Sequence, residues 1–206
     1  APGFGKSDSS DFTMYMIAKL VINLLNNLGI KKLDLVGHSM GGMLAQIISA
    51  EFGKIVNKVV LSCTHKGYAL PPLSPLRKPY SQRLEDRKIL SDEAFGQLRI
   101  KKMLPDLENE EIFRFLSSIS KEITEASIKC GGMAMQQLDT SKHLSKLNQP
   151  CLILKGEKDI VVSSERSNNL EKSLPHAKVI EISNVGHAPY CEKPELFNKT
   201  VHQFLK

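Results

Sequence analysis

Ser39 has the residue type and the surroundings of a catalytic nucleophile. It stands in Gly37-His38-Ser39-Met40-Gly41, which fits the pattern G-x-S-x-G. In that pattern the serine sits on a strained turn between a strand and a helix, and small residues two before and two after it let the chain pass closely. The backbone N–H of the next residue, Met40, is expected to point at the oxyanion that forms on attack.

The sequence around this motif has the elements that such a turn needs. Residues 33–36 (Leu-Asp-Leu-Val) are typical of a short strand, and residues 43–52 place apolar side chains at helical spacing before Gly53. The motif alone is a weak signal, because glycine and serine are common. With a strand before it and a helix after it, a nucleophile is favoured over an incidental glycine-rich turn.

A serine hydroxyl needs a base to attack, and the base needs an orienting carboxylate. Asp159 follows a strand-like run at residues 151–154, and His187 follows another at residues 179–182. Because the carboxyl ends of parallel strands meet at one sheet edge, both residues are expected near Ser39. The order Ser39, Asp159, His187 is also the chain order expected for a G-x-S-x-G scaffold. We therefore predict these three as nucleophile, acid and base.

Other residues compete for the supporting roles. Asp159 could instead cap a turn, and Glu157 is then the second choice of acid. His65 is the main alternative base, because it also follows a strand-like run, at residues 59–61. The remaining competitors rank lower: His38, His143, His176 and His202.

The elements that must position these residues form an interrupted α/β pattern. Residues 1–65 and 146–206 alternate helical patterns with buried strand-like runs, which predicts a parallel sheet covered by helices on both faces. Residues 66–145 begin rich in proline and continue as short amphipathic helical stretches, which predicts a helical cap or lid inserted into the core. One stripe in this insert is interpreted either as core packing or as a wall of a substrate pocket: Ile112, Phe113, Phe115, Leu116 and Ile119.

Composition narrows the classes of partner. The chain has 206 residues, 41% hydrophobic and 24% charged, as in ordinary globular proteins. With no apolar run of about 18 residues and no signal-peptide core at the N-terminus, we expect a cytoplasmic protein that does not enter membranes. The four cysteines lack the spacing of a disulfide framework or zinc site, so reduced thiols and no metal are expected: Cys63, Cys130, Cys151 and Cys191.

The net charge of +6 is concentrated in part of the insert. Between Lys66 and Lys102 basic residues outnumber acidic ones, which would either steer an anionic substrate or form a solvated surface. Aromatic residues do not alternate with these charges as they do where nucleic acid bases stack, so no nucleic acid partner is expected.

Four segments together resemble signatures of the α/β-hydrolase superfamily: residues 37–42 (GHSMGG), 156–162 (GEKDIVV), 186–194 (GHAPYCEKP) and 1–8 (APGFGKSD). Within the superfamily the chain is similar to the group of carboxylesterases, enol-lactonases and carbon–carbon hydrolases. The resemblance implies an α/β fold with a mostly parallel sheet, flanking helices and a helical lid, and it implies no organic cofactor.

The N-terminus departs from the family pattern. In the family, the stretch before the Pro2-Gly3-Phe4-Gly5 loop supplies the first strands and a His-Gly loop with a second oxyanion N–H, whereas this sequence begins at Ala1. We therefore expect an N-terminally truncated chain whose nucleophile strand borders an unpaired sheet edge. Its activity is expected to be impaired, because losing one oxyanion donor lowers the rate by about 10²–10³.

The favoured function is hydrolysis of small-molecule carboxylic esters or lactones through an acyl-enzyme. Hydrolysis of a carbon–carbon bond in a diketone is the nearest alternative, because the same triad serves it, followed by acyl transfer or cofactor-free perhydrolysis. A ligand-binding module that kept the scaffold is disfavoured, because it would not need all three triad residues.

Overall fold

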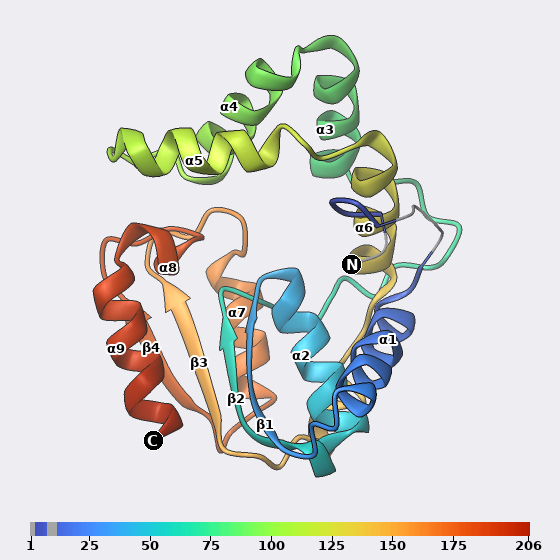
Figure 1. Ribbon diagram of the computed structural model, residues 1–206, viewed down its shortest axis with the longest axis vertical. Coiled ribbons are helices and arrows are strands. Elements are labelled where there is room, and N and C mark those ends of the chain that lie inside the picture. The colour runs from blue at the N-terminus through green and yellow to red at the C-terminus, as the bar shows by residue number, and fades with distance from the viewer. Residues whose placement is uncertain (1–2, 8–11) are drawn as a thin grey trace. The chain divides into compact units, whose positions relative to one another are not determined.

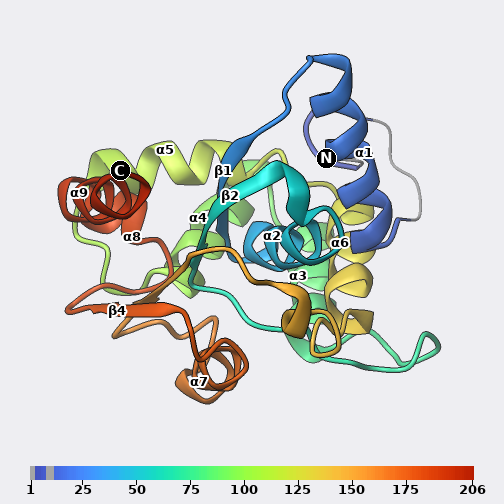
Figure 2. The same ribbon diagram turned by 90° about the horizontal axis from the view of Figure 1, so that it is seen from below.

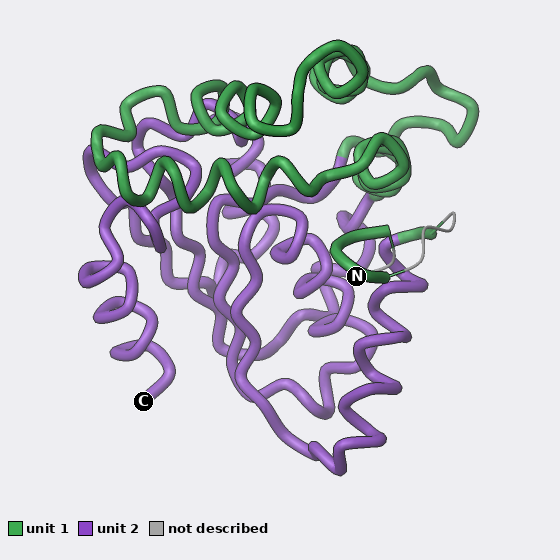
Figure 3. The backbone as a smooth tube through the Cα atoms, turned by 45° about the horizontal axis from the view of Figure 1, so that its top comes forward, with its two compact units in different colours: residues 1–13, 68–138 green, residues 14–67, 139–206 purple. Residues whose placement is uncertain are grey.

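The computed structural model describes residues 3–7 and 12–206, which divide into two compact units (Figure 3). We call residues 14–67 and 139–206 the sheet unit. The helical unit comprises residues 68–138 together with the described residues that precede Met14. Ala1, Pro2 and Asp8 of the N-terminal motif lie outside the described residues.

Four parallel strands build the sheet in the order β1-β2-β3-β4: β1 (Leu33–His38), β2 (Val56–Ser62), β3 (Cys151–Gly156) and β4 (Lys178–Ile182). The predicted parallel sheet is confirmed, and each predicted run lies within one of these strands. Within the described part of the chain β1 pairs with β2 alone, so the strand that leads to Ser39 is an edge strand. Its Val36 side chain is accordingly 45% exposed.

Helices cover both faces of the sheet: α1 (Met14–Asn27), α2 (Met40–Glu51), α7 (Ser164–Lys172), α8 (Pro189–Glu192) and α9 (Pro194–Leu205). Figure 2 shows α9 on one side and α2 and α7 on the other. On the α9 side, Phe197 packs against Val60 of β2 and Leu152 of β3. Short 3-10 turns at Gly53–Ile55 and Leu144–Lys146 complete this unit. The central strands β2 and β3 are buried on both faces, which explains their continuous apolar runs at residues 59–61 and 151–154.

The strand register places the candidate residues at one end of the sheet. His38 pairs with Ser62, Ser62 with Leu154, and Gly156 with Ile182. The four segments that follow these strand ends therefore begin side by side, and each carries chemistry-bearing residues (Figure 1). This is the carboxyl edge of a parallel sheet, where such sites assemble.

Four helices form most of the helical unit: α3 (Lys78–Ile89), α4 (Asp92–Met103), α5 (Glu110–Ser120) and α6 (Glu125–Gln137). Side-chain oxygens of Ser91, Asn109 and Thr124 accept the N–H groups of the first turns of α4, α5 and α6. These caps satisfy donors that have no acceptor within the helix. They explain why stretches with few apolar residues still begin helices at defined positions.

The boundaries of the two units differ from the boundaries predicted for the core and the insert. Residues 139–145 lie in the sheet unit, where the Thr140 hydroxyl donates to the buried Gln46 amide oxygen, 2.7 Å away. Residues 3–7 lie in the helical unit, because the Ser127 hydroxyl donates to the Gly3 carbonyl and the Phe4 ring lies beside Gly131. Composition alone does not mark these boundaries.

The interpretation of the α5 stripe as core packing is wrong for part of it. Phe115 and Ile119 are 60% and 51% exposed, whereas the buried residues of α5 are Ser117 and Ser120. The reason is the close approach of α4: a Cβ on Gly96 would lie 2.3 Å from the Ser117 carbonyl oxygen. Only small side chains fit between the helices at the contact of Gly96 with Ser117, whereas Phe115 and Ile119 face outward and the other apolar side chains of the stripe are half-buried.

Candidate active site

Ser39 sits on the strained turn that its motif predicts. Its backbone has φ 52° and ψ −119°, in the left-handed range that residues with side chains rarely adopt. The turn is held from behind, because the Ser39 N–H donates to the Ser62 carbonyl and the Thr64 hydroxyl donates to the Ser39 carbonyl, 2.7 Å away. The serine side chain is thereby presented at the end of β1.

The close packing expected of the motif glycines is confirmed for one of the two. A Cβ on Gly37 would lie 2.4 Å from the Gly41 carbonyl oxygen, whereas a Cβ on Gly41 would meet nothing within 4 Å. The second crowded glycine is instead Gly42, whose Cβ would lie 2.6 Å from Thr64. The start of α2 thus approaches β1 closely at Gly37 and approaches the segment after β2 closely at Gly42.

The structure brings Ser39, His187 and Asp159 together in one hydrogen-bonded chain. His187 Nε2 lies 3.0 Å from Ser39 Oγ, and His187 Nδ1 lies 3.0 Å from Asp159 Oδ2. The side chains of His187 and Asp159 are 4% and 6% exposed. This is the geometry in which an imidazole can take a hydroxyl proton while a carboxylate holds the ring and stabilises its charged form.

The neighbourhood of Asp159 favours its ionised form. Burial alone would raise its pKa, but the hydrogen bond and charge of His187, together with the N–H groups of Val162 and Val161, hold the pKa of Asp159 below its usual value. The two N–H groups donate to Oδ1 at 2.9 and 2.8 Å. A carboxylate with these donors is fixed in orientation and stays charged, as an acid that orients a histidine must.

Met40, the predicted oxyanion donor, is the first residue of α2. Its N–H is therefore among those at a helix start that have no acceptor within the helix. The positive end of the helix dipole lies at the same place, which favours an anion there. The chain thus offers one backbone donor beside Ser39.

The loops that carry Asp159 and His187 are tied to each other. The Lys158 N–H donates to the Val185 carbonyl at 2.8 Å, and the Glu157 carboxylate accepts the Asn184 N–H at 2.7 Å. A Cβ on Gly156 would lie 2.1 Å from the Gly186 carbonyl oxygen, so glycine is required for this approach. These hydrogen bonds and this close approach hold the loops that carry Asp159 and His187 together.

His38 packs against the base rather than acting as one. Its ring centroid lies 4.9 Å from that of His187 and 4.9 Å from that of Tyr190. Burial, and then the nearby His187, lower the pKa of His38 to about 3. His38 is therefore favoured in its neutral form beside the imidazole of His187.

The other competitors are occupied elsewhere. Glu157 receives the Asn184 N–H, and buried His65 accepts the Gly67 N–H through Nδ1, 3.0 Å away. His143 bonds to Tyr15 and to the Glu51 carboxylate. His176 and His202 are exposed. It is the ring of His187 that bonds to both Ser39 and Asp159, so the predicted choice of three residues matches the observed grouping.

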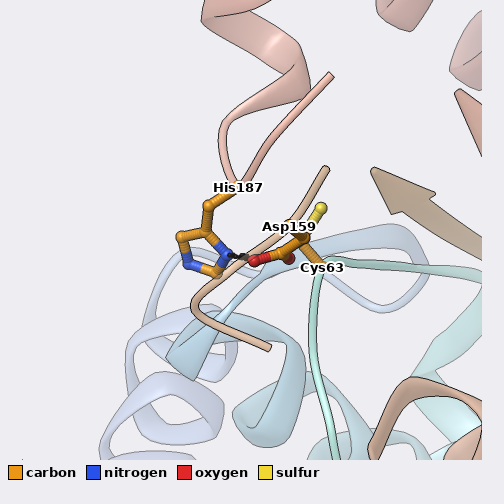
Figure 4. A group of neighbouring side chains, drawn as sticks. All are labelled: Cys63, Asp159 and His187. Carbon is orange, nitrogen blue, oxygen red and sulfur yellow. Dashed lines mark hydrogen bonds and ion pairs between the residues drawn. The ribbon is translucent and has the colours of Figure 1, made fainter. Parts of the chain in front are cut away.

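Cys63 is a neighbour of the triad that sequence reasoning missed. It follows β2 directly, and its Sγ, a carboxylate oxygen of Asp159 and a ring nitrogen of His187 all lie within 4.8 Å of one another (Figure 4). The sequence did contain a signal for Cys63, because it follows the carboxyl end of a strand, as each of the other site residues does. Burial, followed by the Asp159 charge, raises the pKa of the Cys63 thiol to about 12. Since metal binding needs a thiolate and a free imidazole nitrogen, this set fits a resident metal poorly.

The basic residues of the helical unit are partly neutralised. Lys102 pairs with Asp86 at 2.6 Å, Arg87 with Asp92 at 2.7 Å and Lys121 with Glu93 at 3.0 Å. The Arg77 guanidinium lies 3.5 Å from the centroid of the Tyr68 ring. These pairings are typical of a solvated, mixed-charge surface.

The family model described as "alpha/beta hydrolase fold" matches residues 1–194. The chain belongs to the α/β-hydrolase fold family. This confirms the resemblance inferred from the four motifs, together with the fold it implies. In the described part of this hydrolase-fold chain, no helix combines the length and apolar character needed to cross a membrane.

Several relatives and solved structures are similar over nearly the whole chain. The uncharacterized hydrolase YugF of Bacillus subtilis is 26% identical, over 100% of this chain and 78% of its own length. A 2-hydroxy-6-oxononadienedioate/2-hydroxy-6-oxononatrienedioate hydrolase of Burkholderia vietnamiensis is 27% identical, over 100% of this chain and 74% of its own. The crystal structure of the enol-lactonase from Burkholderia xenovorans superposes with a TM-score of 0.84 at 19% identity, covering 99% of this chain and 78% of the other. That likeness concerns the fold.

Proposed function

We propose that this protein is a serine hydrolase that cleaves carboxylic esters or lactones of small molecules. The observation that carries the proposal is the hydrogen-bonded chain from Ser39 through His187 to a buried Asp159. The strained backbone of Ser39 and the helix N-terminus at Met40 are what such a reaction requires of its nucleophile and oxyanion donor.

The reaction has two halves. His187 Nε2 takes the Ser39 proton as Oγ attacks the carbonyl carbon, and the Met40 N–H stabilises the oxyanion. His187 then protonates the leaving alkoxide, which gives an alcohol and an acyl-enzyme. Water attacks this ester with His187 again accepting the proton, and collapse of the second oxyanion releases the acid and restores Ser39. In a lactone the alcohol and the acid are parts of one product.

We propose in addition that the helical unit acts as a lid that selects the substrate. The support is topological, because the insert leaves and re-enters the sheet unit beside the carboxyl edge of the sheet. Gly67 and Asp139 form an antiparallel bridge, and the Thr140 N–H donates to the Lys66 carbonyl. Inserts that leave from this edge of an α/β sheet are placed to control a site built on its loops.

Hydrolysis of a carbon–carbon bond is the second candidate, because several relatives are named as hydrolases of 2-hydroxy-6-oxo-dienoates. The same residues would then act on a ketone carbon, with water attacking and a carbon leaving group that takes the proton. A substrate series separates the candidates. We expect p-nitrophenyl butyrate and a small lactone to be hydrolysed with larger kcat/KM than a 2-hydroxy-6-oxo-dienoate.

Covalent labelling tests the shared chemistry. We expect a fluorophosphonate to modify Ser39, detected as an added mass on its peptide, and the Ser39→Ala variant to remain unlabelled. Ser62 offers a matched control, because this buried serine lies at the end of the neighbouring strand and should not react. A folded protein that is not labelled would contradict the serine-hydrolase proposal.

A further inference from the structure

The loop that carries His187 is bracketed by a carboxylate from the next helical turn. Glu192 Oε2 accepts the N–H of Gly186 and Glu192 Oε1 accepts the N–H of Ala188, both at 2.8 Å. These are the backbone groups immediately before and after His187. From this geometry we infer that Glu192 is a positioning residue, which fixes the base of the proposed reaction without touching the substrate.

The arrangement forms a closed local ring. Glu192 is the last residue of α8, and its own N–H donates to the Ala188 carbonyl at 2.9 Å. The Glu192 side chain thus binds the N–H of the same residue, Ala188, whose carbonyl accepts the Glu192 N–H. His187 sits inside a loop whose two ends are joined through one side chain, so the backbone at 187 has little freedom to rotate.

The ionised carboxylate suits this role better than its neutral isostere. It has two oxygens, and each receives one backbone N–H in a charge-assisted hydrogen bond. A glutamine in place of Glu192 would keep the shape but would replace one oxygen by an NH₂ group, which cannot accept. One of the two N–H groups would then face another donor, and its hydrogen bond to residue 192 would be lost.

Other ties of this loop hold a different part of it. The bonds from Lys158 to Val185 and from Asn184 to Glu157 fix the chain before Gly186 against the acid loop. The two hydrogen bonds to Glu192 span the base itself. In the described part of the chain they are the side-chain contacts that restrain the N–H groups on both sides of His187.

This inference rests on the proposed function, because positioning matters through the base. His187 must keep one nitrogen 3.0 Å from Ser39 Oγ and the other 3.0 Å from Asp159. A displacement of about 1 Å at a reacting group can lower a rate by about 100-fold. We expect Glu192→Gln to reduce kcat for p-nitrophenyl butyrate by about ten- to one hundredfold, with KM changed by less than about twofold, as for a contact needed mainly in the transition state.

Two control variants separate positioning from stability. Glu195→Gln removes a carboxylate from the exposed start of α9 and should keep the wild-type kcat. Val201→Ala weakens the packing of α9 on the sheet core and should lower Tm while leaving kcat unchanged below the transition. Wild-type kcat in Glu192→Gln would overturn the inference. The inference would also be overturned if Val201→Ala lost as much kcat as Glu192→Gln when both variants had the same decrease in Tm.

A structural measurement keeps this test independent of activity. In a crystal structure of Glu192→Gln we expect the distance from His187 Nε2 to Ser39 Oγ to increase by about 0.5 Å or more, within the roughly 1 Å that matters for a reacting group, and amide hydrogen exchange at Gly186 and Ala188 to speed up. Retention of the wild-type distance would overturn the role of Glu192. A wild-type protein that neither hydrolyses the ester nor reacts with fluorophosphonate refutes the proposed function instead, and the crystal structure and exchange rates still decide the role of Glu192.

Discussion

Glycine residues allow close approach of the backbone both at the carboxyl edge of the sheet and between α4 and α5, but the two contacts have different consequences. At the sheet edge, Gly37 and Gly156 let backbone segments touch, and the touching segments carry the candidate catalytic side chains. In the α4–α5 pair, Gly96 lets two helices touch, while Phe115 and Ile119 of α5 are exposed on its other side. Close approach in the sheet unit therefore brings candidate catalytic residues together, whereas in the helical unit it packs two helices against each other.

The largest expected effect tests the sheet edge. In Asp159→Asn an amide replaces the carboxylate that faces His187 Nδ1, so the ring loses its orienting acceptor and the stabilisation of its charged form. We expect kcat for p-nitrophenyl butyrate to fall by about 10⁴-fold. The matched control is Glu157→Gln, two residues away, whose carboxylate holds the Asn184 N–H rather than the base. A greater loss in Glu157→Gln than in Asp159→Asn would mean that the acid is wrongly assigned.

The next effect tests the helical unit. Phe95 of α4 is 1% exposed, and Phe95→Ala is expected to lower the free energy of unfolding by about 3–5 kcal/mol through lost burial and the cavity left behind. Phe115→Ala on the outward face of α5 should lower it by less than about 1 kcal/mol, because its ring is already largely in water. Urea unfolding followed by circular dichroism measures both. Equal losses would show that the outer face of α5 is packed.

The same contrast explains which features the sequence could predict. Ser39, Asp159 and His187 were found because each follows a strand, and parallel strands bring their carboxyl ends together whatever the side chains between them. Cys63 also follows a strand, but its type suggested a free thiol rather than a site neighbour. Glu192 belongs to the signature at residues 186–194, but the sequence assigns it no role, because its partners are backbone N–H groups, which carry no sequence signal.

Packing between helices limited the prediction elsewhere. The apolar stripe of α5 has a helical period, and that period was read correctly as an amphipathic helix. Which face is buried depends on the distance between α4 and α5, and a single glycine on the partner helix, Gly96, sets that distance. A one-dimensional pattern contains no such information, so the sequence leaves open whether the stripe packs in a core or lines a pocket.

The third prediction concerns the acid side of the stability profile and returns to the sheet edge. The pKa of His38 is lowered from 6.5 to about 3, first by burial and then by His187. Between these two pH values the unfolded chain binds a proton that the folded protein excludes, so stability is complete above about pH 6.5 and falls as the pH drops toward 3. The loss attributable to His38 is expected to be roughly 3 kcal/mol, after allowance for partial exposure.

His38→Gln provides the measurement for this group. It removes the titration, so the free energy of unfolding should decline less between about pH 6.5 and about pH 4 than in the wild type. Below about pH 4, Asp159 adds a loss of its own, because its folded pKa lies below the usual 3.8 and its stabilisation disappears as the carboxylate is protonated. A wild-type slope in His38→Gln would assign the acid sensitivity to other groups.

The smallest effect expected concerns the cysteines. Burial raises the pKa of Cys63 and of Cys151 to about 12, so at about pH 8 almost no reactive thiolate is present at either position. Cys191 is less buried, and its pKa is raised by burial and by the neighbouring Glu192. Iodoacetamide should therefore modify Cys191 before Cys63 and Cys151, as peptide mass spectrometry of timed samples can show.

The order of modification also tests how Cys63 relates to the triad. Because its thiol is neutral beside the Asp159 carboxylate, Cys63→Ala should change kcat by less than about threefold, in contrast to the loss expected for Asp159→Asn. If Cys63 instead reacted as fast as Cys191, the thiol would have to be ionised or exposed next to a buried carboxylate. The carboxyl edge would then be open to water at Asp159, and the rigid placement of acid and base described for the sheet unit would not hold.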